Sequence, residues 1–528
     1  MTTVLVLGAG IMQGPSLRAA RRMGWRTVAA DANPEAPCRS LADRFALVDL
    51  KDREGMLALA RSLKEGEGLD AVFTAGTDFS TTVSYVCERL GMPCVPRAAA
   101  ERATDKHLMR RALQASGVPC PGFAEYDGAG DPVEASRGLR LPLVVKPVDN
   151  MGSRAVRRVD VVEELRGACR DAIAVSRSGR AVIEEYMDGP ELSLDAIVWR
   201  GDVFICGVAD RIIRFPPFFV EMGHTMWTAL PAADRTSVER VFRDGIRALG
   251  IDNGAAKGDI KLTSRGPMVG EIAARLSGGY MSGWTFPLAS GVEVTEAALR
   301  VAAGLEPGDL SPKRRWTSAE RAFISIPGIV RSVEGVEEGK STIGVREIFV
   351  LTGTGRRTVF PTSNVEKAGN VISCSESRET AIAAAEAAAA RILVRLEPSN
   401  GHTDAFLFAD PSGCPHPAFT LNRDEDRSAL EAMPAFLGAA AAARAGVPIG
   451  VLTLPVMESE PSRDWHGRSL REAVGQLADR GIIRLVTAST AGAFALGRVF
   501  WRAFLRGSVQ AGAYVVDSLA GGTEVLHR

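Results

Sequence analysis

Alternation of short apolar runs with helical patterns over residues 1–120 constrains the fold of this 528-residue chain more than any other feature. Residues 3–7 and 27–31 are strand-like runs, and a helical pattern that ends near Arg22 lies between them. A further run at 70–74 precedes a helical pattern that begins near Thr81. Strands that alternate with helices in this order form a parallel sheet with right-handed crossovers. The sequence therefore predicts an α/β fold.

The turn after the first of these strands carries Gly8, Gly10 and Gly14, and Asp31 ends the second strand. Dinucleotide-binding domains place glycines beside the pyrophosphate and an acid on the ribose in this general order. The spacing here is G-x-G-x-x-x-G instead of G-x-G-x-x-G, and Pro15 follows the third glycine. A tight strand-to-helix turn explains these glycines better than a nicotinamide site does.

Composition excludes several classes of protein. Lys plus Arg and Asp plus Glu both number 63, so the formal net charge is zero, which argues against a nucleic-acid or anionic-membrane binder. The eight cysteines form no C-x-x-C pair, which is typical of thiols in a reducing cytoplasm and not of zinc sites or disulfides. The first residues do not show the basic segment and long apolar run that predict a signal peptide, and no apolar run approaches the roughly 18 residues of a membrane span. We expect a cytoplasmic protein that does not enter membranes.

A lysine followed by a donor-rich loop marks the centre of the chain. Val144 and Val145 predict a strand that leads into Lys146, and the loop that follows contains Gly152, Ser153 and Arg154. Backbone N–H groups, a hydroxyl and a guanidinium are the donors that a cover over a polyphosphate needs. The chain contains no G-x-x-x-x-G-K-[ST] motif, so this is not a P-loop.

Two acidic segments follow this loop. An apolar strand from Ala181 runs into Glu184, Glu185, Tyr186 and Met187, and Glu191 begins the next strand, whose alternating apolar residues over 192–198 predict one buried sheet face. Farther on, a predicted hairpin carries one acid on each strand, Asp259 and Glu271. Two acids on paired strands repel each other unless a cation lies between them, and oxygen ligands suit magnesium.

The last part of the chain is less informative. Short strands near 322–326, 348–351 and 370–373 precede an alanine-rich helix that we expect from Arg378 to Leu396, and 398–401 is expected to be a linker. Residues 402–528 predict a separate α/β unit in which no mechanism is visible. Its candidate polar or aromatic groups are His416, Trp465 and His466, and we expect an ordinary structural role for each.

The charged residues occur in an order that suits the ATP-dependent activation of a carboxylate. Lys106 in the first turn of a helix and Lys146 would neutralise phosphate oxygens, while a closing loop excludes water. The hinge after Ala181 would offer backbone groups to adenine, and the hairpin acids would hold magnesium.

Residues 1–396 resemble an ATP-grasp ligase, and the N-terminal part is similar to the pre-ATP-grasp domain of biotin carboxylase and carbamoyl phosphate synthetase. Gly223-His224, the run Glu271–Gly279 and the region 321–396 look most like the L-amino-acid ligase, or carboxylate–amine ligase, group. The resemblance implies an ATP-grasp fold with a Rossmann-like N-terminal domain and an added C-terminal α/β unit. The implied domains cover 1–103 (pre-ATP-grasp), 104–310 (nucleotide-binding, with a mobile lid at about 120–190), 311–398 (closing subdomain) and 402–528 (added α/β domain).

The resemblance also implies roles for single residues. The nucleotide-binding set consists of Lys106, Lys146, Gly152, Ser153, Arg154, Glu184, Glu185, Tyr186, Met187 and Glu191. Asp259 and Glu271 match the metal carboxylates, with Asp where many relatives carry Glu. Arg275 matches the arginine that steadies the acylphosphate and the tetrahedral intermediate, and His224 matches a substrate-side histidine.

Ala273 departs from the pattern, because many ATP-grasp enzymes carry a metal-binding Asn at that position. A second magnesium would therefore rely on Glu271 and phosphate alone, or bind more weakly.

The activity that the resemblance implies is ATP-dependent joining of a small carboxylic acid or amino acid to an amine or amino acid. It uses ATP and Mg²⁺, with Mn²⁺ as an alternative, and releases ADP and phosphate. Neither nucleic acid nor membrane is expected as a partner, and a homodimer is expected by analogy. The alternatives are a bicarbonate-activating enzyme, a non-catalytic ATP-binding scaffold and, least favoured, a nicotinamide oxidoreductase.

Overall fold

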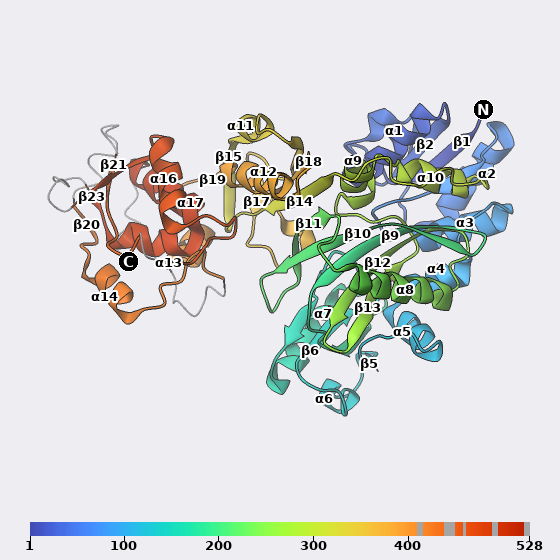
Figure 1. Ribbon diagram of the computed structural model, residues 1–528, viewed down its shortest axis with the longest axis horizontal. Helices are drawn as coiled ribbons and strands as arrows, with labels where there is room; N and C mark the ends of the chain where they lie inside the picture. The colour runs from blue at the N-terminus through green and yellow to red at the C-terminus, as the bar shows by residue number, and fades with distance from the viewer. Residues whose placement is uncertain (409–415, 438–448, 458–460, 488–494, 522–528) are drawn as a thin grey trace. The chain divides into compact units, whose positions relative to one another are not determined.

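The computed structural model describes residues 1–528 except 409–415, 438–448, 458–460, 488–494 and 522–528 (Figure 1). The chain divides into two compact units. The first comprises Met1–Glu320, Thr362–Asn364 and Ile372–Ile382, and the second comprises Arg321–Pro361, Val365–Val371 and Ala383–Arg528. The division into four domains expected from the sequence stays a prediction.

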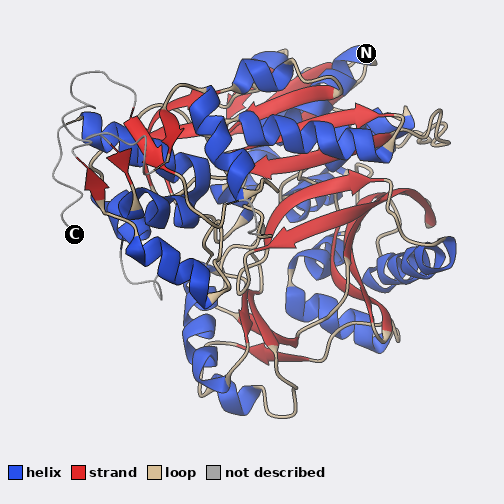
Figure 2. Cartoon of the chain, turned by 60° about the vertical axis from the view of Figure 1, so that its left-hand side comes forward, coloured by secondary structure: helices blue, strands red, loops and turns tan. Residues whose placement is uncertain are grey.

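The N-terminal sheet of the first unit is parallel, as predicted, with the order β3-β2-β1-β4. Its strands are β1 (Thr3–Leu7), β2 (Arg26–Asp31), β3 (Arg44–Leu47) and β4 (Ala71–Phe73). Alternate residues of β1 face opposite sides: Leu5 and Leu7 pack with α2 (Arg53–Gly66) and α3 (Ser80–Leu90), whereas Val4 and Val6 pack with α1 (Gly14–Arg22) and α10 (Val294–Ala302). Helices on both faces make this a doubly wound layer (Figure 2).

A small antiparallel sheet occupies the region expected to be the lid. Its order is β5-β8-β6-β7, built from β5 (Phe123–Tyr126), β6 (Leu143–Pro147), β7 (Arg157–Val159) and β8 (Ala181–Glu185). Helices α6 (Pro132–Ala135) and α7 (Leu165–Val175) belong to the same region, and α7 packs on the sheet through Leu165, Ala168 and Ala172.

The part of the large sheet that lies in the first unit runs in the order β13-β12-β9-β10-β11-β14-β18. The strands are β9 (Glu191–Trp199), β10 (Asp202–Arg214), β11 (Val220–Met226), β12 (Gly254–Thr263), β13 (Gly266–Ala273), β14 (Thr317–Phe323) and β18 (Gly369–Ser375). Leu192, Leu194 and Ile260 pack against Phe242 of α8 (Ala232–Leu249), so the buried face predicted from the alternation is confirmed. Figure 1 shows α8 beside β12 and β13.

Two helices precede the small sheet, α4 (Arg97–Thr104) and α5 (Lys106–Ala115). Asp105 is the N-cap of α5, because its side chain accepts a hydrogen bond from Leu108 N. Lys106 is therefore the first residue of the helix, as expected from the sequence.

The second unit contains a three-stranded sheet, β17-β15-β19, formed by β15 (Gly328–Glu334), β17 (Arg357–Thr358) and β19 (Leu393–Leu396). The alanine-rich helix α12 spans Arg378–Arg391, so the expectation of a helix to Leu396 is wrong. Leu393 and Val394 instead pair with Glu334 and Val333 of β15, where burial in a sheet outweighs helix propensity.

The C-terminal part of the second unit has a four-stranded sheet with the order β20-β23-β21-β22. Its strands are β20 (Phe436–Leu437), β21 (Ile449–Leu452), β22 (Ile483–Val486) and β23 (Ala495–Leu496), and β21 and β22 are parallel. Its described helices are α13 (Gly401–Phe408), α14 (Asp424–Ala432), α16 (Leu470–Asp479) and α17 (Arg498–Ala520). Trp501, Phe504 and Tyr514 are buried residues of α17. Within the described residues no helix has both the length and the apolarity to cross a membrane, and every cysteine is a free thiol.

Candidate functional site

One face of the large sheet is polar, and it carries four of the residues singled out from the sequence, namely Glu191, His224, Asp259 and Glu271. Strand pairing places Lys261, Glu191, Arg211 and His224 in one row across β12, β9, β10 and β11. The next row contains Glu271, Asp259 and Ser193 on β13, β12 and β9. Residues two apart on a strand share a face, so the two rows lie side by side opposite the α8 side of the sheet.

Arg211 joins the acids of this face. Its guanidinium bonds Glu191, lies 2.9 Å from Glu221 Oε2 and lies 2.9 Å from Asp259 Oδ2. Three carboxylates around one buried guanidinium hold its pKa well above the ordinary range, although burial alone would lower it. Arg211 was not among the predicted residues; its place on β10 opposite Glu191 depends on strand register.

The two predicted metal acids, Asp259 and Glu271, are direct cross-strand partners. Asp259 is buried, accepts from Ser193 Oγ at 2.9 Å and pairs with Lys257 and Arg211. Burial alone would raise the pKa of Asp259, but these two cations outweigh it and lower the pKa. Glu271 is partly exposed, and its Oε1 lies 3.8 Å from Lys106 Nζ. Two carboxylates converging from paired strands provide the oxygen ligands that magnesium requires.

The two predicted nucleotide lysines are held by different partners. Lys106 is buried in the first turn of α5, and its Nζ donates to Asn150 O at 3.0 Å. Lys146 Nζ lies 2.8 Å from Glu184 Oε2, and Arg110 Nε lies 2.7 Å from Glu184 Oε1. Burial alone would raise the pKa of Glu184, but Arg110 and Lys146 outweigh it and lower the pKa to about 2. Glu184 is thus an ionised anchor for Lys146.

The remaining hinge residues are Glu185, which ends β8, and Tyr186 and Met187, which lie between β8 and β9. Arg140 binds both carboxylate oxygens of Glu185 at 3.1 Å, and the ring of Tyr186 lies below Lys261 Nζ (5.0 Å to the centroid). Met187 O accepts a hydrogen bond from Lys261 Nζ at 3.0 Å. Lys261 therefore ties the hinge to the same row of the large sheet that contains Glu191.

The loop between β6 and β7 has an unusual backbone. Gly152 and Ser153 have φ of +69° and +58°, and Gly152 O accepts from Asn364 N at 3.0 Å. The Arg154 guanidinium donates to Met151 O at 3.1 Å, within its own loop. Positive φ at two successive residues makes this loop a tight turn, a class of backbone conformation that can form anion-binding concavities.

His224 lies between two acids. Its Nδ1 is 2.9 Å from Glu320 Oε2, its Nε2 is 3.6 Å from Glu221 Oε2, and all three residues are buried. Glu221 and His224 are three residues apart, yet both face the polar side because a bulge interrupts the β10–β11 register between Ile212 and Ile213. The period of two in the sequence gives no sign of this bulge, so the pairing was not predicted.

Arg275 leads from β13 into a loop beside the N-terminal sheet. Its Nη2 lies 3.0 Å from Asp78 Oδ1. In the same loop Ser277 donates to Asp195 through its N–H (2.9 Å) and its hydroxyl (2.6 Å). Burial raises the pKa of Asp195 to about 6, against the lowering effect of Ser277. Asp78 and Asp195 are further residues that the sequence did not single out.

The side chains of Gln13 and Asp31 occupy the glycine-containing turn after β1. The Gln13 side chain accepts from Gly10 N at 3.1 Å, and a Cβ on Gly8 would lie 2.9 Å from Gln13 Cδ. Asp31 accepts from Ala9 N at 2.8 Å. These contacts support the tight-turn interpretation of the glycines.

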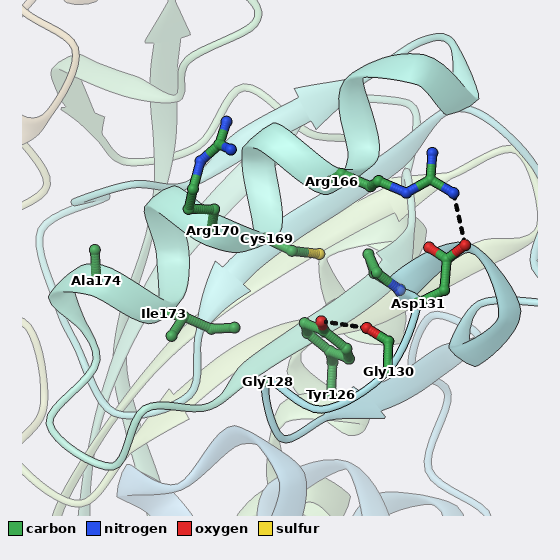
Figure 3. Close-up of a pocket in the computed structure, with 10 residues that line it drawn as sticks. Tyr126, Gly128, Gly130, Asp131, Arg166, Cys169, Arg170, Ile173 and Ala174 are labelled. Atoms are coloured by element: carbon green, nitrogen blue, oxygen red, sulfur yellow. Dashed lines mark hydrogen bonds and ion pairs between the residues drawn. The ribbon is translucent and has the colours of Figure 1, made fainter.

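A cavity of about 730 Å³ opens in the small-sheet region, and no residue of the polar face is among those that line it (Figure 3). Figure 3 shows Tyr126 bonded to Gly130 O and Arg166 paired with Asp131 beside the Cys169 thiol. Burial raises the pKa of Cys169 to about 12, so this thiol is an inert core group.

Comparisons with known families give two matches. Residues 139–283 match the ATP-grasp domain, and residues 322–397 match the L-amino acid ligase C-terminal domain 2. The first match contains the donor loop, the hinge and the acid pair, and the second begins within β14.

Individual proteins agree with these matches. The uncharacterised protein y4rH of Sinorhizobium fredii is 25% identical over 382 residues, which cover 69% of this chain and 77% of that protein. Human carnosine synthase 1 is 27% identical over 331 residues, or 58% of this chain and 40% of that protein. The chain therefore corresponds to less than half the length of the carnosine synthase.

The crystal structure of an L-amino acid ligase from Bacillus licheniformis superposes with a TM-score of 0.68 at 22% identity, covering 75% of this chain and 99% of that one. Phosphoribosylglycinamide synthetase from Anaerococcus prevotii superposes with a TM-score of 0.60 at 19% identity, over 75% of this chain and all of that chain. The expected ATP-grasp fold with an extra C-terminal domain is confirmed.

Proposed function

We propose that this ATP-grasp chain, which continues into an L-amino acid ligase C-terminal domain, is an ADP-forming carboxylate–amine ligase. When bound, ATP supplies the phosphoryl group that activates a carboxylate, and attack by an amine then forms a C–N bond and releases phosphate. The observation that carries the proposal is the polar face, where Asp259 and Glu271 oppose each other beside Lys106 and Arg211.

This chain's residues suit a nucleotide polyphosphate. Lys106 and Lys146 are anchored cations, and the loop Gly152–Arg154 offers backbone N–H groups and a guanidinium. The backbone of the hinge over 184–187 is the proposed adenine contact, and Glu191 the proposed ribose contact. Cations that are already held in place lose little entropy when phosphate binds.

Magnesium fits the acid pair, with Asp259 and Glu271 as the residues that would hold it. Asp259 already bonds Arg211 and Lys257, so a metal must compete with two cations for its oxygens. We therefore expect Mg²⁺ to bind together with the nucleotide, whose phosphates can take over those cations. Mn²⁺ has similar oxygen preference and is expected to substitute.

The proposed substrates are a small carboxylic acid or amino acid and an amine or amino acid, in line with the name of the L-amino acid ligase relative. Arg275 and His224 are proposed to serve the acid side. Arg275 can stabilise developing negative charge as a bidentate donor. His224, held between Glu221 and Glu320, faces the polar side where the acid would lie.

The test is Mg²⁺-dependent ADP release by the full chain with pooled amino acids and small carboxylic acids. ADP and phosphate appearing only when two substrates are present support the ligase. Release of AMP and pyrophosphate would contradict it, and turnover stimulated by bicarbonate alone would support a bicarbonate-activating enzyme instead.

Two variants sharpen this test. Lys146→Ala and Glu271→Ala are expected to abolish ADP release while the fold survives, because each removes a group proposed to contact phosphate or metal. Lys51→Ala, which changes an exposed lysine of the first unit, is the matched control and should retain wild-type turnover. Wild-type turnover in Glu271→Ala would disprove the metal assignment.

A further inference from the structure

Arg110 is a completely buried arginine that the proposed reaction does not use directly. It lies on α5 one turn after Lys106, with 0% of its surface exposed. Residues four apart on a helix share a face, so both cations project to the same side of α5. Burying a guanidinium is costly unless it makes hydrogen bonds. Arg110 makes two hydrogen bonds, and each connects it to a different part of the candidate site.

The first bond connects Arg110 with a nucleotide lysine. Arg110 Nε donates to Glu184 Oε1 at 2.7 Å, and Lys146 Nζ is 2.8 Å from the other carboxylate oxygen. Glu184 and Lys146 are diagonal neighbours on β8 and β6, where Glu184 pairs with Val144. The position of Lys146 thus depends on the Glu184 carboxylate, whose other oxygen accepts a hydrogen bond from Arg110.

The second bond reaches the strand that carries a metal acid. Arg110 Nη2 donates to Gly270 O at 2.6 Å. Asp259 pairs with Glu271 and Ile260 pairs with Val269, so Gly270 is the extra residue of a β-bulge. A bulge redirects the side chains next to it, and the residue that follows this one is Glu271. The direction of Glu271 therefore depends on a peptide that Arg110 holds.

We propose that Arg110 is a positioning residue that sets Lys146, through Glu184, and Glu271, through Gly270, in one arrangement for the nucleotide and its metal. The proposal rests on the proposed function, because it assigns purpose to groups that bind ATP and Mg²⁺. A guanidinium has several donors in a rigid fork and can serve two acceptors on different strands, whereas lysine is a point charge.

Removing Arg110 has a definite electrostatic consequence. The buried Glu184 carboxylate would then rely on Lys146 for compensation, and Lys146 would be held more firmly by Glu184 and be less available to phosphate. At the same time the Gly270 peptide would lose its donor, and Glu271 would lose its fixed direction.

The test measures MgADP affinity of the full chain by calorimetry for the wild type, Arg110→Met, Arg110→Lys, Glu184→Gln and the double variant Arg110→Met/Glu184→Gln. Arg110→Met should bind MgADP roughly 10–100-fold more weakly, the range seen when supporting partners of a metal site are removed. The double variant should bind no more weakly than Arg110→Met alone, because both changes break the same connection to Lys146. Unchanged affinity in Arg110→Met, or strictly additive losses, would overturn the proposal.

Metal dependence separates positioning from a general loss of structure. Arg110→Met and Arg110→Lys should raise the Mg²⁺ concentration needed for half-maximal ADP binding, because both disturb the bond to Gly270. Glu184→Gln keeps that bond and should leave the Mg²⁺ requirement near the wild-type value. Equal shifts in all three variants would overturn the connection through Gly270.

Two precautions keep the result decisive. If Arg110→Met fails to fold, the double variant and Arg110→Lys are compared with the wild type instead. The double variant avoids the uncompensated carboxylate, because its residue 184 is neutral. If the wild-type chain binds no MgADP, the proposed function is overturned, and this inference with it. If the wild type binds MgADP and Arg110→Met binds it equally tightly, only the inference about Arg110 is overturned.

Discussion

Two buried carboxylates of the first unit, Glu184 and Asp259, have a lowered pKa because cations lie beside each of them. Glu184 lies between Arg110 and Lys146, and Asp259 lies between Arg211 and Lys257. Each pairing offsets the cost of removing charge from water, and each also fixes a cation at a known place. The charge pattern that stabilises the unit is thus the pattern that a polyphosphate would meet.

Glu184 should make the free energy of unfolding depend on pH in the acidic range. Its folded-state pKa of about 2 lies below the ordinary value of 4.5, so the stabilisation is complete above pH 4.5 and is lost as pH falls toward 2. The shift corresponds to a loss on the order of 3 kcal/mol. Glu184→Gln should flatten the fall in unfolding free energy between these pH values. The measurement is denaturant unfolding across that range, with Glu101→Gln, whose side chain is 41% exposed, as the control that keeps the wild-type slope.

Replacing Ala273 with asparagine should raise the affinity of the site for Mg²⁺. It lies two residues after Glu271 on β13, on the same face, and has no oxygen to offer a cation. Ala273→Asn adds an amide oxygen there, so the Mg²⁺ concentration for half-maximal ADP release should fall several-fold. Titration of activity with Mg²⁺ checks this, and Ala273→Val controls for added volume. An unchanged requirement in Ala273→Asn would show that position 273 does not face the metal.

At the scale of elements, two β-bulges and one hinge arrange the site. The bulges at Gly270 and between β10 and β11 bring acids to one face, and the hinge between β8 and β9 passes close to β12. Gly189 lies where the hinge passes close to β12. Its φ is +77°, and a Cβ at this position would lie 2.0 Å from Leu262 O.

Gly189→Ala should therefore destabilise the first unit through both backbone strain and steric clash. Gly179→Ala is the matched control, because Gly179 has φ of +67° and nothing within 4 Å of its Cβ position. The control should lose about 1–2 kcal/mol from the left-handed conformation alone. Gly189→Ala should lose clearly more, measured as the free energy of unfolding. Equal losses would mean that the close approach to Leu262 is relieved at no cost.

At the scale of the whole chain, α17 joins the C-terminal segment to the rest of the second unit. Gln510 Oε1 accepts from Ile326 N at 2.9 Å, and its amide donates to Ser325 Oγ at 2.8 Å. Arg395 pairs with Asp517 of the same helix. Helix α17 therefore packs against the region that matches the L-amino acid ligase C-terminal domain.

Gln510→Ala should lower the stability of the second unit by about 1–3 kcal/mol, because it leaves the buried Ile326 N–H without its acceptor. Arg502→Ala, on an exposed ion pair of the same helix, should change stability little. Thermal unfolding of the full chain compares the two. A Gln510→Ala chain as stable as Arg502→Ala would show that this contact contributes little to the second unit.

The sequence by itself determined the parallel N-terminal layer, the buried face of β9 and the order of the predicted site residues. These features depend on local periodicity and on spacing along the chain, which a single sequence displays. It also placed Asp259 and Glu271 on the two strands of one hairpin, but their direct pairing depends on the bulge at Gly270, which the sequence did not show. It was wrong about the end of α12, where pairing with β15 overrides helix propensity.

Only the tertiary structure decided which charges meet. Arg110 and Glu184 are 74 residues apart, Arg275 and Asp78 are 197 apart, and His224 and Glu320 are 96 apart. Such pairs depend on bulges, on the packing of α5 against two sheets, and on loops that cross between layers. Local residue patterns do not encode those long-range arrangements, so the partners that hold the predicted residues in place became visible only in the folded chain.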